Sequence, residues 1–137
     1  MAETAAEQWP LRRGSLIYPT PVAIACGRVL RARTAAERVN ACLKAAEVLT
    51  RYLATVAVAS FASRDDDAEA KLSELSGNLS FGHFLTTVLE ITAARGQHPA
   101  QQLLRYSFRV SKKEKGSGAT NEALSRLLTL RNRLGHE

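Results

Sequence analysis

The fold is decided by one stretch, TAAERVNACLKAAEVLTRYLATVAVASFA, residues 34–62. It opens on Thr34 and carries Glu37 three positions later, the spacing at which two side chains satisfy each other's unpaired backbone N–H groups at the start of a helix. Apolar or small residues then recur in alternating steps of three and four. These positions are Val39, Cys42, Ala46, Leu49, Leu53 and Val56, and the stripe is widened by Leu43, Ala57 and Phe61. Because this is the period of a helix with one buried face, the stretch predicts a single long core helix from Ala35 to Ala62.

Shorter helices are predicted on both sides of the long one. Pro21 follows Thr20 at the first position of a helix that runs to about Arg33, and Ser80 precedes another that runs to about Arg95. Two more are expected at residues 98–106 and from Thr120 or Asn121 onward. Residues 1–19, which contain Trp9-Pro10, predict an irregular N-terminal arm. Residues 20–137 therefore predict an all-α bundle of four or five helices, which suits a chain with 45% hydrophobic and only 6% aromatic residues.

The charge is concentrated in the last third of the chain. The formal net charge is +6, and residues 99–137 carry eight basic and three acidic residues, which is +5 of it. Much of this charge lies in a basic segment, SKKEKGSGAT, residues 111–120. Its glycines lack the spacing of a phosphate-binding P-loop, so nucleotide binding of that type is excluded. A basic segment of this kind favours a polyanionic partner such as RNA.

The cysteine content and the hydropathy pattern favour the cytoplasm. Cys26 and Cys42 are the two cysteines, and both fall within predicted helices, as free thiols of a reducing compartment do. The first fifteen residues lack the apolar core of a signal peptide. The longest uncharged stretch, residues 52–63, is too short to span a bilayer, so no membrane partner is expected.

No metal or cofactor site is expected. The three histidines are scattered, and neither cysteine lies at ligand spacing from them. The run Asp65-Asp66-Asp67 lacks the spaced oxygen ligands and the glycine of a calcium loop. His83 is expected to be the half-buried polar tip of a helical first turn, and His98, before Pro99, a loop residue.

The last helix carries one residue that its apolar side does not explain. Leu124, Leu127, Leu128 and Leu134 form that side, and the same spacing places Arg131 on it. An ion at such a position is costly unless it is paired or needed. Three explanations remain open: the guanidinium reaches back to water, it pairs with a carboxylate such as Glu47 or Glu90, or it binds an anion.

The string Arg131-Asn132-Arg133-Leu134-Gly135-His136, on a leucine-rich helix after a long capped helix, resembles the R-x4-6-H motif of the HEPN superfamily. These are small α-helical bundles, many of which are ribonucleases of bacterial toxin–antitoxin, CRISPR-associated and other antiviral defence systems. The resemblance covers the helix order over most of residues 34–137, and the motif itself is six residues long. In the family a further helix follows the motif, so we expect this bundle to be the N-terminal part of a larger protein.

The resemblance implies a metal-independent endoribonuclease without a cofactor that acts as a homodimer by attack of the ribose 2′-hydroxyl. His136 would be the general acid or base, Arg131 would stabilise the charged phosphate, and Asn132 would orient either group. Residues expected to hold the RNA backbone are Arg105, Arg109, Lys112, Lys113, Lys115 and Arg133. The alternative is a non-catalytic interaction, dimerisation or sensor domain of a larger defence or signalling protein, with the protein's other domains or separate proteins as partners.

Overall fold

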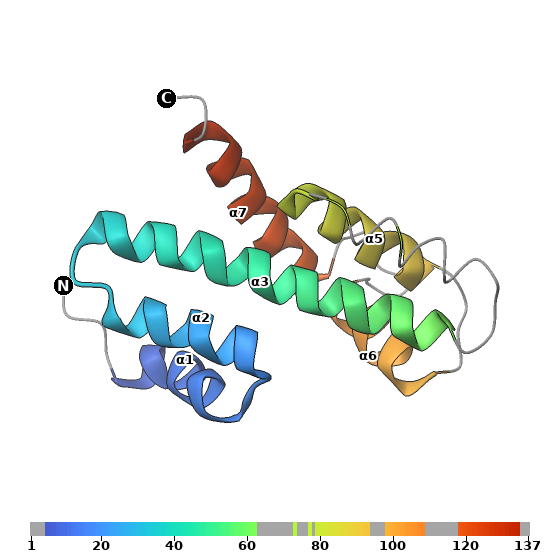
Figure 1. Cartoon of the computed structure of the whole chain (residues 1–137), viewed down its shortest axis with the longest axis horizontal. Helices are drawn as coiled ribbons and strands as arrows, with labels where there is room; N and C mark the ends of the chain where they lie inside the picture. Colours follow the sequence, from blue (N-terminus) through green and yellow to red (C-terminus); the bar gives the residue numbers. More distant parts are fainter. Residues whose placement is uncertain are drawn as a thin grey trace. The chain divides into compact units, whose positions relative to one another are not determined.

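The computed structural model describes residues 5–62, 73, 77, 79–93, 98–108 and 118–134 of the chain. Within these residues it contains six helices and no strand, so the all-α class is confirmed. The chain divides into two compact units, Met1–Leu49 and Thr50–Glu137. Each unit is described by itself below, and the helices are labelled in Figure 1.

The first unit contains α1 (Ala5–Ile17), α2 (Thr20–Arg31) and the first part of α3 (Ala35–Ala62). The prediction of an irregular arm before residue 20 was wrong, because α1 is helical and continues through Pro10. Gly14 accounts for its packing, since a Cβ atom there would lie only 3.0 Å from the Sγ atom of Cys26 on α2. The absent side chain lets α1 approach α2 closely, and this tertiary contact offsets the backbone hydrogen bond that a helical proline removes.

The start of α2 lies one residue earlier than predicted. Pro19, not Thr20, is the N-cap, and it makes no side-chain capping bond. Its carbonyl oxygen accepts the N–H groups of Val22 and Ala23 at 2.9 and 3.0 Å. The helix ends at Arg31, two residues before the predicted end, where the N–H of Ala32 bonds back to the carbonyl of Val29 at 3.3 Å.

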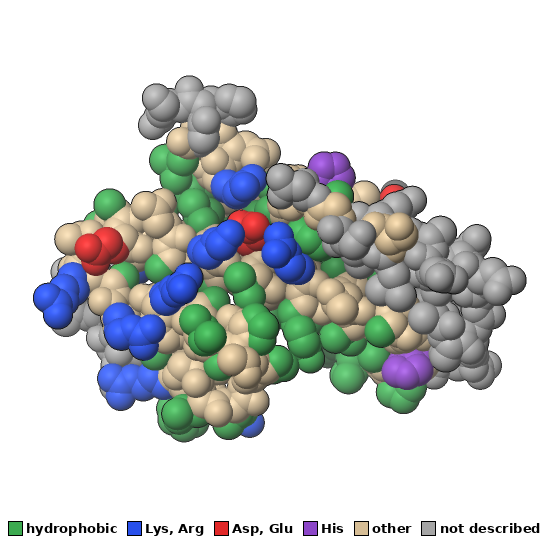
Figure 2. All heavy atoms as spheres, in the orientation of Figure 1, with side chains coloured by type: hydrophobic (Ala, Val, Ile, Leu, Met, Phe, Trp, Pro, Cys, Tyr) green, Lys and Arg blue, Asp and Glu red, His purple; other side chains and the backbone are tan. Residues whose placement is uncertain are grey.

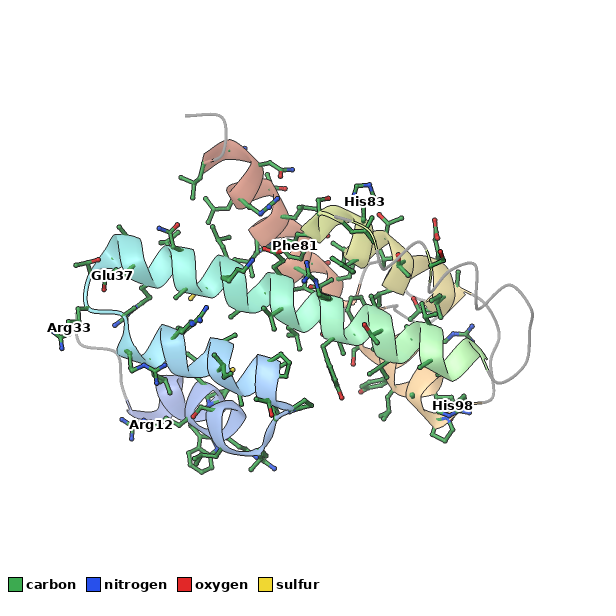
Figure 3. All side chains as sticks on the ribbon, in the orientation of Figure 1. Arg12, Arg33, Glu37, Phe81, His83 and His98 are labelled. Atoms are coloured by element: carbon green, nitrogen blue, oxygen red, sulfur yellow. The ribbon has the colours of Figure 1, made fainter. Side chains whose placement is uncertain are left out.

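The long helix α3 has the predicted bounds, Ala35–Ala62, and the predicted cap. The backbone N–H of Glu37 donates to Thr34 Oγ1 at 3.1 Å, and Glu37 Oε2 accepts the N–H groups of Thr34 at 3.3 Å and Arg33 at 2.8 Å. Figure 3 shows Arg33 and Glu37 together at this end of the helix. The capping box is therefore confirmed. Glu37 also accepts the N–H of Arg33, a third backbone donor that the pattern does not predict.

We expect Thr34→Ala to lower the free energy of unfolding by about 1 kcal/mol, because the mutant leaves the Glu37 N–H without its acceptor. Urea unfolding followed by circular dichroism measures the change. Thr55→Ala is the matched control, since Thr55 is an exposed threonine inside the same helix whose hydroxyl bonds only to the Arg51 carbonyl. Equal losses in the two variants would show that the cap contributes nothing.

The buried row of α3 coincides only in part with the predicted one. Leu43, Ala46 and Ala57 are buried as predicted, whereas the side chain of Phe61 lies outside the described residues. Val39 is 39% exposed, and four of the other predicted positions are half-buried (Cys42, Leu49, Leu53 and Val56). The buried residues of the helix are Leu43, Ala46, Thr50, Ala54, Ala57, Val58 and Ser60. Small side chains predominate in this row because they allow neighbouring helices to pack closely. A prediction based on the bulky apolar residues of α3 therefore misplaces the centre of its buried face.

The second unit packs the rest of α3 with α5 (Phe81–Ala93), α6 (Pro99–Phe108) and α7 (Ala119–Leu134). The apolar period of residues 81–95 predicts that Phe84, Leu85, Val88 and Leu89 face inward. The first three are buried in α5, and Leu89 is half-buried. Phe81, the first residue of α5, was not predicted in the core but has no exposed surface. Across the unit, the Arg51 guanidinium lies over the Phe84 ring at 4.8 Å, and Gln101 Nε2 lies 3.5 Å from the Ser60 carbonyl oxygen.

Candidate functional site

The helix that carries the motif begins just before the predicted cap. The α7 helix starts at Ala119, and the N–H of Glu122 bonds to the carbonyl of Gly118 at 3.0 Å. Gly118 is itself fixed, because its N–H donates to the carbonyl of Phe108 at the end of α6 at 3.2 Å. These two hydrogen bonds hold the start of α7 next to the end of α6.

Only one leucine of α7 reaches the core of the unit. Leu124 is 4% exposed, Leu127 and Leu128 are half-buried, and Leu130 and Leu134 are 39% and 45% exposed. The helix therefore packs through its first half, while its last two turns keep apolar side chains uncovered.

Arg131 lies at the margin of the apolar row. Its side chain is half-buried, as are those of Leu127 and Leu128 one turn before it. Within the described part of the unit Thr50–Glu137, its guanidinium has no hydrogen bond and no ion pair. Glu90 of this unit is therefore not its partner, and no described residue of the unit offsets the charge, which is costly unless it reaches water or an anion.

The structure brings Arg131 and Asn132 together in the last turn of α7 and leaves the histidine of the motif undescribed. Asn132 and Arg133 are exposed. His136 lies outside the described residues, as do four of the predicted RNA contacts, Arg109, Lys112, Lys113 and Lys115. On the face drawn in Figure 2, Lys and Arg side chains outnumber Asp and Glu side chains among the described residues.

Arg105, another predicted RNA contact, is used within the fold. Its Nε atom donates to the carbonyl oxygen of Thr92 at 3.2 Å, and Nη2 lies 3.4 Å from that of Ala93. These are the last carbonyls of α5, so the guanidinium caps the C-terminal end of that helix. Its positive charge also interacts favourably with the negative end of the helix dipole. Arg133, by contrast, lines a shallow hollow of about 300 Å³ on the outer side of α7, together with Arg126 and Leu130.

A larger hollow, which the sequence did not indicate, lies where α5 meets α7. It has a volume of about 490 Å³ and is lined by residues that include Leu79, Ser80, Gly82, His83, Glu90 and Leu128. The two helices come close here, since a Cβ atom on Gly82 would lie 3.7 Å from Leu128 Cδ2. The only sequence signal of this site is the Ser80-x-x-His83 spacing at a helix start.

His83 is exposed, so the expectation of a half-buried polar tip was wrong. Its Nδ1 atom accepts the backbone N–H of Ser80 at 3.3 Å and lies 2.8 Å from the Ser80 Oγ atom. The ring therefore caps the start of α5, and Figure 3 shows it projecting from the first turn. His98 has a related role at α6, where its Nδ1 atom accepts the N–H of Ala100 at 3.2 Å.

Neither cysteine belongs to a site. Neither forms a disulfide, and Cys26 is buried while Cys42 is half-buried. Burial raises the pKa of the Cys26 thiol above its ordinary value, which keeps it protonated and unreactive. Among the described residues, no three His, Cys, Asp or Glu side chains are grouped as metal ligands. The described helices also include none that is long and apolar enough to cross a membrane.

Comparison with known proteins gives no relative for this chain. No family model, no curated protein and no solved structure matches it.

Proposed function

We propose that this chain is a metal-independent endoribonuclease domain of HEPN type that acts as a homodimer in a bacterial defence or toxin system. The observation that carries the proposal is Arg131, a half-buried guanidinium on a leucine-rich helix with no partner among the described residues of its unit. A charge at such a position is costly, and a phosphate is the ligand that a guanidinium fork fits best.

The chemistry of the motif residues suits cleavage of RNA at a phosphodiester. Imidazole exchanges protons near neutral pH, so His136 would take the proton from the 2′-hydroxyl or give one to the leaving oxygen. Arg131 would stabilise the negative charge that develops on the phosphate during attack. Asn132, adjacent to Arg131 and exposed, would orient the histidine or the phosphate.

Pairing of two copies through the end of α7 is supported by its uncovered leucines. Leu130 and Leu134 lie beside Arg131 and Asn132 and remain well exposed. Burial of these side chains against a second copy would remove apolar surface from water and bring two sets of motif residues together. The basic residues Arg109, Lys112, Lys113, Lys115 and Arg133 would hold the RNA backbone through charge.

The second candidate is a non-catalytic dimerisation, interaction or sensor domain. The same exposed leucines favour it, because they suit binding to a protein surface whether or not RNA is cleaved. In either case the proposed compartment is the cytoplasm, where the two free thiols are stable.

The nuclease proposal predicts cleavage of single-stranded RNA in the presence of EDTA. The protein is separated by gel filtration, and each fraction is incubated with labelled RNA or with the same sequence fully methylated at the 2′-oxygens. We expect fragments with 2′,3′-cyclic phosphate ends from the unmodified RNA alone, because the 2′-hydroxyl is the nucleophile. The activity should follow the dimer peak.

A folded dimer that leaves RNA intact would contradict the nuclease proposal and favour the interaction domain. Cleavage that elutes away from the protein peak would show a contaminating enzyme. Cleavage by the monomer peak would retain the nuclease and overturn the dimer.

A further inference from the structure

His83, one of the residues that line the hollow between α5 and α7, carries a hydrogen-bond donor that no described residue uses. The Nδ1 atom of His83 is held by Ser80, at 3.3 Å from its N–H and 2.8 Å from its Oγ atom. Because Nδ1 is the acceptor, the proton of the neutral ring is on Nε2. The side chain is exposed, so this Nε2–H is fixed in direction and open to a ligand.

The hollow shares a face of α7 with the motif arginine. Leu128 forms the α7 wall of the hollow, and Arg131 follows three residues later. Residues three apart lie on the same side of a helix, about 4.5 Å apart along its axis. Arg131 therefore lies one helical turn beyond the α7 wall of the hollow, on the same side of that helix.

The other residues that line the hollow give it an apolar wall and, at the end away from His83, a carboxylate. Its apolar lining is provided by leucines of both helices and of the segment before α5, namely Leu79, Leu85, Leu89 and Leu128. Glu90 lines it seven residues after His83, which is about 10.5 Å along the helix axis. An anionic group beside His83 is thus remote from the Glu90 carboxylate, which can accept a hydrogen bond from a hydroxyl or amino group at the far end.

We propose that this hollow holds one nucleotide of single-stranded RNA, with its phosphate hydrogen-bonded to His83 Nε2–H and its base against the leucines. The ribose hydroxyl or a base amino group is directed toward Glu90. This inference rests on the proposed function, because the same strand then continues to Arg131. His83 acts here in binding and does not enter the cleavage chemistry.

The test measures the affinity of the whole chain for fluorescein-labelled single-stranded RNA by anisotropy in EDTA. His83→Asn removes the Nε2–H but keeps a short acceptor that can serve the Ser80 N–H. We expect its affinity to fall about tenfold, the effect of one hydrogen bond to a charged group. His98→Asn is the matched control, since His98 is also exposed and also caps a helix through Nδ1 but does not line the hollow.

A second measurement observes the ring directly. Long-range ¹H–¹⁵N spectra should show the Nε2 resonance of His83 shifting on addition of RNA, with that of His98 unchanged. Equal affinities of parent and His83→Asn protein, or equal losses in both variants, would overturn the inference. If the parent cleaves RNA and His83→Asn binds as the parent does, this site alone is wrong. If the parent neither binds nor cleaves RNA, the proposed function is wrong as well.

Discussion

Replacing His136 with alanine, or Arg131 with leucine, is expected to lower RNA cleavage in EDTA by at least about a hundredfold. Removal of a general acid or base costs about 10² to 10⁴ in rate, and removal of one preorganised donor to a developing oxyanion about 10² to 10³. Single-turnover cleavage of labelled RNA by parent and variant dimers measures both effects.

The Arg131→Leu variant should also differ from the parent in thermal stability. Arg131 is half-buried with no partner among the described residues of its unit, so leucine replaces an uncompensated charge with an apolar side chain that suits the row of Leu124 and Leu128. We expect Arg131→Leu to melt at a higher temperature than the parent. A purely structural role for Arg131 predicts the same rise in melting temperature with RNA cleavage unaffected.

Arg126→Leu is the matched control for Arg131→Leu. Arg126 is an exposed arginine of the same helix, so the variant loses the same charge from the outer side of α7. It should retain cleavage within about a factor of two, since Arg126 is an exposed charge that is not among the residues proposed to contact RNA or the second copy. If it loses as much activity as Arg131→Leu, the effect comes from the net charge of the helix and not from the position of the motif arginine.

Phe81→Ala is expected to lower the free energy of unfolding by about 3–5 kcal/mol, the cost of removing a fully buried phenylalanine. Phe81 has no exposed surface, although it occupies the first turn of α5. Urea unfolding followed by circular dichroism measures the loss, and the slope of the transition shows whether the variant still unfolds cooperatively.

Tyr106→Ala provides the control for Phe81→Ala. Tyr106 is an aromatic residue of the same unit that is 88% exposed, so its removal should change the free energy of unfolding by less than about 0.5 kcal/mol. Similar losses in the two variants would contradict the burial of Phe81. Unchanged stability in both would mean that α5 does not pack as the structure shows.

Phe81 and His83 belong to one helical turn with two roles. Phe81 fixes the start of α5 in the core, and Ser80 holds His83 outward at the α7 crossing. The burial of Phe81 therefore determines where His83, the hydrogen-bond donor of the proposed nucleotide site, lies.

The sequence by itself determined the elements whose signals are local. The Thr34 and Glu37 pair and the apolar period that follows it predicted the start and approximate length of α3, because capping bonds and helical periodicity involve neighbours within a few positions. The all-α class followed from the same period in the other helices. The motif in the last turn of α7 was also visible in the sequence, since its residues are adjacent along the chain.

Only the tertiary structure decided the features that depend on contacts between helices. Pro10 argued against a helix, yet α1 forms because Gly14 admits the close approach of Cys26. The sequence could not show that Arg105 caps α5, nor that His83 borders a hollow with Leu128, because each depends on residues remote in the chain. Local patterns leave several faces of a helix nearly equal, and packing between helices decides which one is buried. For this reason the buried row of α3 coincides only in part with the predicted one.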